Sequence, residues 1–418
     1  MAAVMPPVLL WQRLHRISLV FFARAMAHPT LSLLLLPLLA LSCGGKAPTT
    51  DSGAPSADDL ARLQQLGYAD YTEVDESGRP NGGLIHDAEA MAPGVNLLSV
   101  HKLCRARLVD AEGAILHEWS RPGKVWGHAD LQPDGSILVP TVEEDGSFLV
   151  KLDWRNRLVW RADVTAHHDV EVLPDGTIAT LTFLWRDMPQ VAKDADVRDE
   201  QLVLLDAEGN KTQEYSIIEM LDASPDWEWE KVEAAKVKGE RDRIDLLHAN
   251  SVAWMRPGWE AWNPLFAEGN VLVSMRHQNR VVMLRPETGE LLWQWGRGEM
   301  LGQHDATVLP NGNVLIFDNG LSRGWSRGVE VNPTTDEVVW EWKAPRPEAF
   351  YTMARGASQR LPNGNTILVD SDHGHAFEVT AAGKVVWEYY QPSSGGKVAA
   401  IVRLKRFPVD YLGSLLDG

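Results

Sequence analysis

The sequence is poor in cysteine. Its 418 residues include two, Cys43 and Cys104. A single pair of cysteines excludes a disulfide-stapled scaffold and a cysteine-rich metal site. If Cys43 is lipidated, Cys104 has no partner, and we expect it to be a small buried apolar side chain.

Clustered positive charge is also missing. The formal net charge is −17, and no basic cluster interrupts residues 84–390. This argues against nucleic acid and against anionic lipid as ligands of that region, because both require a basic surface. We therefore predict no nucleic-acid partner.

Long apolar runs are limited to one short stretch, residues 31–43, which ends on Cys43. It is too short for a comfortable membrane-spanning helix and fits the core of a signal peptide. Ala40, Leu41, Ser42 and Cys43 resemble a bacterial lipoprotein cleavage box. We expect residues 1–43 to be a signal and residues 44–59 a flexible tether. The protein would then be extracytoplasmic, in the periplasm or at the cell surface, and lipid-anchored to a membrane if Cys43 is modified; an ordinary secretory signal is the alternative.

What the sequence does contain is a sixfold repeat. Each unit has a tight turn, a strand-like run, a second polar turn and another apolar run that ends on an aromatic residue. The first turns end at Gly94, Gly135, Gly176, Asn270, Gly312 and Gly364, and the aromatic residues are Trp119, Trp160, Tyr215, Trp293, Trp340 and Trp387. Two turns and four strands per unit are typical of a propeller blade. The pattern predicts an all-β fold, a six-bladed β-propeller of four-stranded blades, over residues 84–392.

The segments outside the repeats have simpler expectations. Residues 60–83 should form a short N-terminal helical segment and a lead-in, and residues 393–418 a closing segment that packs on the first or last blade. Most of the 17 tryptophans should pack between blades. Long loops at 185–200, 216–247, 318–328 and 344–356 should build up one face, with a solvated helix within 224–243.

Histidines recur in one slot of the repeat. His86, His168 and His304 each lie eight residues before the turn glycine of their unit, His128 lies seven before, and His248 opens the fourth unit. The slot begins the innermost strand, so several imidazoles should meet at one mouth of the central channel. For His86 and His128 a purely structural, hydrogen-bonded role remains an equal alternative.

A metal site is a second interpretation of this slot, since three imidazoles suit zinc. The nearby carboxylates, Asp169 and Asp305, should alternate away from the channel, and Arg276 should point into it. A cation beside a metal is unfavourable. We therefore predict no metal and no cofactor.

Two further polar groups share the mouth. Asn250 lies two residues after His248 on the same strand face, and Arg276 follows the second strand of the fourth unit. Imidazole, amide and guanidinium donors together suit a tetrahedral oxyanion such as sulfate. A neutral imidazole is also a competent nucleophile near pH 7.

These residues resemble those of the bacterial arylsulfate sulfotransferases, which need no nucleotide sulfate donor. The matching stretches are 167–170, 248–250, 274–280, 303–306 and 317–320. The resemblance implies a six-bladed propeller that moves a sulfuryl group from an aryl sulfate to a phenolic acceptor, in ping-pong fashion, through a sulfohistidine. It implies His304 as the nucleophile. It also implies that Arg276, His248, Asn250 and His168 bind the sulfuryl and phenolic oxygens.

Loop aromatics such as Trp325 and Tyr351 could hold the aryl ring. Two other functions remain open. One is a non-catalytic binding propeller. The other is a quinone-dependent oxidoreductase, suggested by the stretch Glu287–Trp293, although the calcium-binding acidic residues that such enzymes need are not evident.

Overall fold

The computed structural model describes residues 71–237 and 241–416. The expected signal, tether and N-terminal helix lie outside these residues. Within the described part, no helix is both long and apolar enough to cross a membrane.

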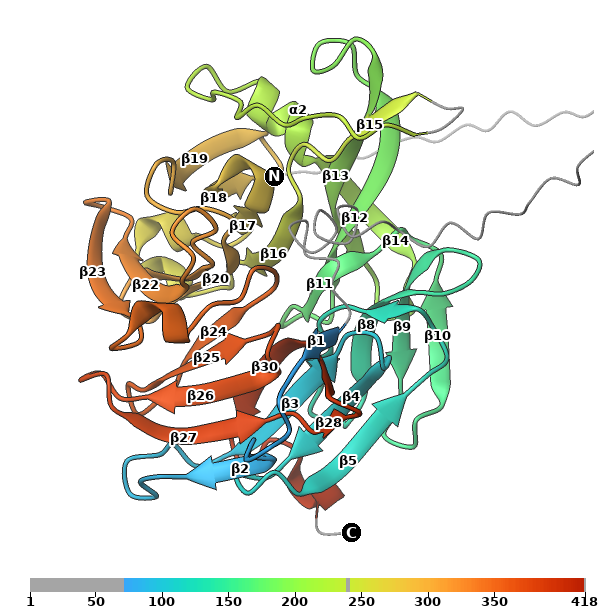
Figure 1. Cartoon of the computed structure of the whole chain (residues 1–418). Coiled ribbons are helices and arrows are strands. Elements are labelled where there is room, and N and C mark those ends of the chain that lie inside the picture. Colours follow the sequence, from blue (N-terminus) through green and yellow to red (C-terminus); the bar gives the residue numbers. More distant parts are fainter. Residues whose placement is uncertain (1–70, 238–240, 417–418) are drawn as a thin grey trace, which may run out of the picture. The chain divides into compact units, whose positions relative to one another are not determined.

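Six sheets of four or five strands make up most of the described chain (Figure 1). The first contains, in spatial order, β30 (Ile401–Phe407), β3 (Val95–Val100), β4 (Arg105–Val109) and β5 (Ile115–Ser120). The second contains β6 (Val125–Trp126), β7 (Asp130–Leu131), β8 (Ile137–Val142), β9 (Ser147–Leu152) and β10 (Leu158–Ala162). The third contains β11 (His167–Val172), β12 (Ile178–Asp187), β13 (Ala195–Leu205), β14 (Lys211–Ser216) and β15 (Asp242–Ile244).

The other three follow the same plan. The fourth contains β16 (Ala249–Trp254), β17 (Val271–Met275), β18 (Arg280–Arg285) and β19 (Glu290–Trp295). The fifth contains β20 (His304–Val308), β21 (Val314–Asp318), β22 (Arg327–Asn332) and β23 (Glu337–Trp342). The sixth contains β24 (Ala357–Arg360), β25 (Thr366–Asp370), β26 (His375–Val379), β27 (Val385–Tyr390) and β2 (Gly82–Ile85). All pairings in these sheets are antiparallel except that of β15 with β13.

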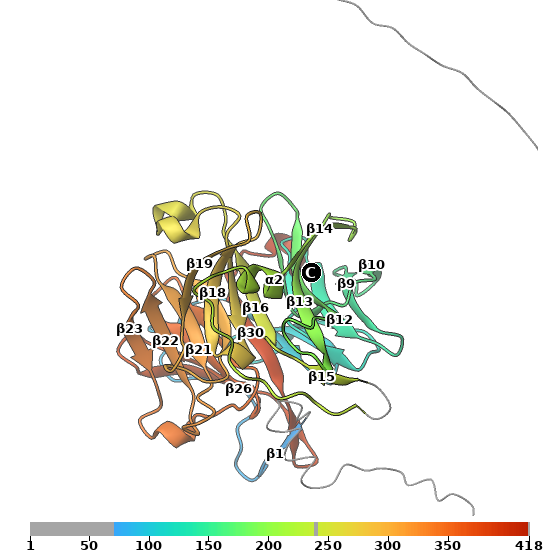
Figure 2. The same cartoon turned by 90° about the horizontal axis from the view of Figure 1, so that it is seen from above.

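Smaller elements decorate the sheets. A three-stranded sheet joins β1 (Tyr71–Glu73), β29 (Lys397–Ala399) and β28 (Ser393–Ser394). The helices are α2 (Ile217–Asp222) and the 3-10 turns Trp259–Ala261, Pro264–Phe266, Arg276–Gln278, Pro347–Ala349 and Gly413–Leu416. In Figure 2, β1 and β15 lie on the same side of the six sheets.

The hydrophobic core is divided among the spaces between sheets. Each of six buried clusters joins one sheet to the next, and one of them joins the sixth sheet back to the first. For example, Leu98 and Val100 pack in one cluster with Ile367 and Val369. The inner strands β11, β16, β20, β24 and β30 also neighbour one another in that order, and β8 of the second sheet neighbours β11. The predicted all-β class with four-stranded antiparallel units is confirmed, and the arrangement is propeller-like.

Tryptophan indoles tie the sheets together, as expected for inter-sheet packing. The Nε1–H of Trp119 donates to the carbonyl of Asp153 in the next sheet at 3.2 Å. Trp160, Trp342 and Trp387 make equivalent bonds to the following sheet. In the fourth sheet Trp295 donates to the Asp336 carbonyl. Each bond satisfies an indole donor while the ring fills the inter-sheet space.

The turns also follow the sequence pattern. Gly176 and Gly312 adopt φ values of 89° and 84°, which non-glycine residues rarely reach. At Gly312 a Cβ would lie 2.5 Å from the Trp262 carbonyl oxygen, so a side chain is sterically excluded.

Two local expectations are wrong. The segment around His86 is not an innermost strand: β2 pairs with the outer strand β27, and β30 occupies the inner position beside β3. Because β3 is buried along its whole length, it needs a paired neighbour on its inner side, and the run Ile401–Phe407 supplies one. The helix expected within 224–243 is absent from the described part of that segment, which instead has one isolated bridge between Ala235 and Arg243.

Candidate functional site

A cavity of about 440 Å³ opens among the inner strands and is lined by imidazoles and cations. His168, His248, His304 and Arg276 all contribute to its wall. The structure therefore brings four of the five predicted site residues into one place. Residues that sequence reasoning missed line it as well, notably His101, Lys102, His167, Phe183, Arg198 and Arg355.

The three slot histidines stand at irregularities in their strands. The pairing register shifts between His167 and Val170, between Ala249 and Ser251, and between His304 and Thr307. His168 and His248 adopt φ values of 57° and 47°. Bulges of this kind redirect a side chain that regular pleating would place elsewhere. The same local device thus turns an imidazole toward the cavity in three successive sheets.

The hydrogen bonds of His304 fix its tautomer. Its Nδ1 lies 3.0 Å from the Gly302 carbonyl oxygen and 2.8 Å from Asn319 Oδ1. Asn319 Nδ2 donates to the carbonyls of Thr352 and Arg355, so its Oδ1 is an acceptor. Since both partners of Nδ1 are acceptors, Nδ1 carries the hydrogen and Nε2 carries the lone pair.

The lone pair of His304 meets a single backbone donor. The Arg355 N–H lies 3.2 Å from Nε2, and Arg355 has a φ of 62°. Burial and the charge of Arg276 lower the pKa of His304 well below its ordinary value. The imidazole is therefore neutral at neutral pH, with its lone pair at the cavity wall.

His248 is held by a carboxylate that sequence reasoning overlooked. Its Nδ1 lies 2.6 Å from Asp245 Oδ2, and Arg198 lies 3.1 Å from the same oxygen. Burial would raise the pKa of Asp245, but the attraction of His248 and its hydrogen bond hold it well below its ordinary value. Asp245 is thus ionised, and Nδ1 of His248 donates to it, leaving Nε2 for the cavity. Its spacing, three residues before His248, was the signal available in the sequence.

His168 completes a row of imidazoles. Its ring centroid lies 5.0 Å from that of His248 and 5.0 Å from that of His167. Burial and these neighbouring imidazoles lower the pKa of His168 well below its ordinary value. The cavity therefore combines neutral imidazoles with guanidinium groups.

Asn250 lies behind the cavity wall. It is buried, and its Nδ2 donates to the Gln303 carbonyl at 2.9 Å. Gln303 directly precedes His304, so the amide fixes the strand that carries His304. In the structure Asn250 contacts this strand and does not line the cavity.

The aspartates that follow two slot histidines converge on one arginine. Arg403 of β30 contacts Asp169 at 2.9 Å and Asp305 at 3.1 Å, and all three are buried. The carboxylates also accept the N–H groups of Val252 and Ser358 in neighbouring sheets. We call Asp169, Asp305 and Arg403 the Arg403 cluster. Its aspartates avoid the cavity, as expected, but their convergence on a buried arginine was not foreseen.

The other slot histidines have different surroundings. His86 lies on the outer edge, 43% exposed, with Nε2 2.6 Å from Glu388. His128 is buried but does not line the cavity, and its ring nitrogens have no hydrogen-bond partner within the described residues. Its backbone N–H donates to the His168 carbonyl at 2.9 Å.

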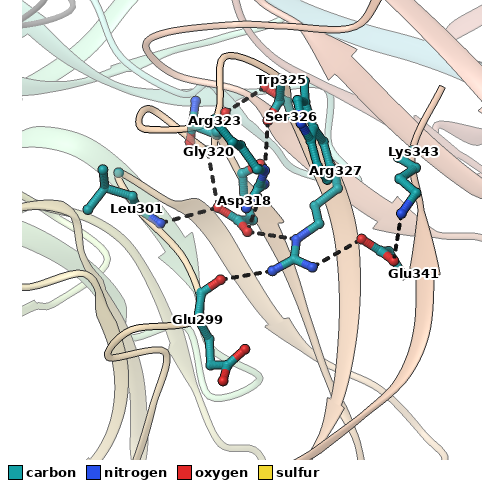
Figure 3. A network of polar contacts seen from close by, with 12 residues as sticks. Glu299, Leu301, Asp318, Gly320, Arg323, Trp325, Ser326, Arg327, Glu341 and Lys343 are labelled. Atoms are coloured by element: carbon teal, nitrogen blue, oxygen red, sulfur yellow. Dashed lines mark hydrogen bonds and ion pairs between the residues drawn. The ribbon is translucent and has the colours of Figure 1, made fainter. Parts of the chain in front are cut away.

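The loop aromatics expected to hold a ring are placed elsewhere. Trp325 does not line the cavity; Arg323 stacks on it at 4.2 Å. Figure 3 shows the reason: Asp318 accepts bonds from Leu301 and Gly320 and pairs with Arg323 and Arg327, which fixes the loop. Tyr351 is likewise absent from the cavity wall. Trp126 of β6 lines the cavity instead, together with Phe183 and Trp185 of β12.

One group of side chains has the composition of a metal site. Ligand atoms of Asp245, His248 and His277 lie within 4.8 Å of one another. However, His248 Nδ1 is bonded to the Asp245 carboxylate, and His277 Nδ1 lies 2.6 Å from the Asp245 carbonyl oxygen. Arg276 and Arg198 also act electrostatically on His248. The group is a hydrogen-bonded chain in a cationic setting, which disfavours a metal ion.

Fold and cavity together define a propeller-like protein with a cavity lined by imidazole and cationic side chains. Residues 128–392 match the family model described as arylsulfotransferase (ASST). The chain therefore belongs to the arylsulfotransferase family, which indicates aryl sulfotransferase activity on small-molecule substrates.

Other comparisons bear on the fold alone. A protein of unknown function from Bacteroides caccae is 15% identical, with a TM-score of 0.51 over 75% of this chain and 99% of that one. Virginiamycin B lyase from Staphylococcus aureus is 11% identical, with a TM-score of 0.43 over 78% of this chain and 89% of that one. No curated protein matches the chain.

Proposed function

We propose that the protein transfers a sulfuryl group from an aryl sulfate to a phenol through a covalent intermediate on His304, without a nucleotide donor. The observation that supports this most directly is the tautomer of His304. Its Nδ1–H is held by Gly302 and Asn319, so the lone pair of Nε2 stands at the cavity wall. A buried neutral imidazole with a fixed lone pair is an activated nucleophile.

In the first half-reaction Nε2 of His304 attacks sulfur. The N–S bond forms as the bond from sulfur to the aryl oxygen breaks. Burial lowers the pKa of His248, and ionised Asp245 opposes this by stabilising the imidazolium, so a His248 that has taken up a proton on Nε2 can give it to the departing oxygen. His168, at 5.0 Å from His248, is the second candidate donor.

Charge builds on the sulfuryl oxygens during this step. Arg276 lies on the cavity wall and acts electrostatically on His304, so it suits these oxygens. The Arg355 N–H can pass from Nε2 to a sulfuryl oxygen once the N–S bond forms. Asn250 serves indirectly by fixing the strand of His304.

The second half-reaction reverses the first. A phenol gives its proton to His248 and attacks sulfur, and the N–S bond to His304 breaks. Both halves use the same groups, so a single cavity suffices for a ping-pong exchange.

Donor without acceptor tests the intermediate. Wild-type protein treated with 4-nitrophenyl sulfate should release one equivalent of phenol and gain one sulfuryl group on His304, seen by mass spectrometry. His304→Ala should release none, a loss of roughly 10⁴-fold or more. His373→Gln, at a half-exposed histidine paired with Asp370, is the matched control. Release that persists in His304→Ala would refute the nucleophile assignment.

We further propose that the six sheets are blades of a closed ring, with residues 84–392 as its body and residues 393–418 as the closing segment. Pairing of β30 with β3 supports this arrangement. A crystal structure should show the first and second sheets joined, as the Ala129 N–H to Ser99 Oγ bond of 2.9 Å indicates.

Export and lipid anchoring of the chain at Cys43 remain proposals from the sequence, and both lie outside the described residues. Wild-type protein should fractionate with membranes, and Cys43→Ser should become soluble or stay unprocessed. Identical soluble behaviour of the two would exclude the anchor.

A further inference from the structure

The cavity wall continues away from the histidines along an unusually long hairpin. β12 has 10 residues and β13 has 11, whereas the matching strands of the other sheets have five or six. The two strands pair without interruption out to Asp187 and Asp196. This extension carries two aromatic residues of the cavity wall, Phe183 and Trp185.

Alternation along β12 places Phe183 and Trp185 on one face of the strand and Leu184 on the other. Phe183 and Trp185 both line the cavity, and Leu184 does not. Apolar side chains of the second sheet, Val125 and Val142, line the same cavity. An aromatic and aliphatic surface therefore adjoins the part of the cavity wall that carries the histidines and Arg276.

The aromatic rings form a row that leads outward. Centroid distances are 5.0 Å from His168 to His167, 5.6 Å from His167 to Phe183 and 6.3 Å from Phe183 to Trp185. The His167 side chain is 10% exposed, and Trp185 is 39% exposed. The row thus runs from the buried imidazoles to solvent and is longer than one aromatic ring.

The hairpin is held rigidly. Arg198 stacks on Phe183 at 4.2 Å and Arg243 on Trp185 at 5.0 Å. Arg186 binds Asp199 at 2.5 Å, and β15 pairs with the start of β13. A surface whose rings are fixed before binding loses little conformational entropy when a ligand stacks on it.

From this geometry we infer that Phe183 and Trp185 form a two-ring aryl subsite, which selects donors whose aryl group is longer than one ring. This inference rests on the proposed sulfuryl transfer at His304. With the sulfuryl group beside His304, a first ring lies near Phe183 and a second ring reaches Trp185. The cavity volume of about 440 Å³ falls within the range for small-molecule sites, roughly 300–1,000 Å³.

Two donors with leaving phenols of similar acidity test the inference: phenyl sulfate and biphenyl-4-yl sulfate. Wild-type protein should prefer the longer donor in kcat/KM. Trp185→Ala should lower the ratio of the two kcat/KM values by about tenfold, the size of one lost aromatic contact. Leu184→Ala, on the same strand and 46% exposed, should keep the wild-type ratio.

The outcomes separate this inference from the proposed function. Equal turnover of both donors, or an unchanged ratio in Trp185→Ala, overturns the two-ring subsite and leaves sulfuryl transfer intact. Failure of wild-type protein to release phenol from either donor, or from 4-nitrophenyl sulfate, overturns the transfer and the subsite together.

Discussion

Two buried charged regions lie within one residue of each other along the chain, yet they manage charge in opposite ways. His168 and His304 face a cavity whose wall carries Arg276 and other cations. The next residues, Asp169 and Asp305, bind Arg403. In the cavity, burial favours the neutral form of the imidazoles, and the positive charge is carried by arginine and lysine side chains of the wall. In the Arg403 cluster, opposite charges are paired. In a bulged strand, two adjacent residues can therefore have different roles: one lines the cavity, and the next stabilises the packing of the sheets.

The prediction with the largest expected effect concerns the Arg403 cluster. Arg403→Met would leave Asp169 and Asp305 buried without their cation, which costs about 3–5 kcal/mol of unfolding free energy. Urea unfolding followed by circular dichroism measures it. Lys405→Met, two residues along the same strand, should cost much less. An unchanged midpoint for Arg403→Met would show that the cluster contributes little.

A second prediction concerns the cationic wall of the cavity. Arg276→Ala should slow donor cleavage by on the order of a hundredfold or more, because one preorganised oxyanion partner is removed. Its unfolding midpoint should fall less than that of Arg403→Met. Arg276→Lys should recover part of the rate. If Arg276→Ala lowers stability and leaves the rate intact, the residue is structural.

The two regions should also differ in their response to pH. Burial and Arg276 hold the pKa of His304 well below the usual value of about 6.5. The unprotonated, nucleophilic form then persists as the pH falls through that value. Protonation of His304 should therefore not lower the single-turnover rate of phenol release as the pH falls from 8 to about 6. A rate that falls below about pH 6.5 would show that His304 titrates like an exposed histidine.

The smallest effect concerns Glu171, two residues beyond Asp169. Burial raises its pKa to about 7, although the Trp254 N–H bond and Arg256 favour its ionised form. The folded state thus binds more protons than the unfolded state from about pH 4.5 to 7, and stability falls as the pH rises through this range. Glu171→Gln should remove about 2 kcal/mol of this change between pH 5 and pH 7.5, since each unit of pKa difference is worth about 1.4 kcal/mol. The prediction would be wrong if the unfolding free energy, measured with urea, changed with pH by the same amount in Glu171→Gln and in the wild type.

The features that the sequence predicted well are those that repetition reveals. Turn glycines such as Gly176 and Gly312 recur at fixed positions because only they tolerate the backbone there. Histidines in one slot of successive repeats occupy equivalent positions, so His168, His248 and His304 meet in one cavity. The repeat spacing alone therefore predicted that these residues lie close together, although no individual contact could be predicted from it.

The features that the sequence did not reveal depend on single contacts between distant segments. Arg355 reaches His304 through its backbone, which no side-chain pattern signals. The choice between β30 and the His86 segment as inner strand depends on competition for the same edge of β3. Trp325 was predicted to hold the aryl ring, but the contacts of Asp318 fix its loop away from the cavity.

The position of β30 has a consequence for synthesis on the ribosome. The first sheet lacks its inner strand until residues 401–407 have left the exit tunnel, so it is among the first parts made and the last to be completed. During that interval β3 presents an open edge, and Asp169 and Asp305 await Arg403. A nascent chain would therefore carry the cavity histidines before it can hold them in place, and premature termination a few residues short would leave it open to aggregation.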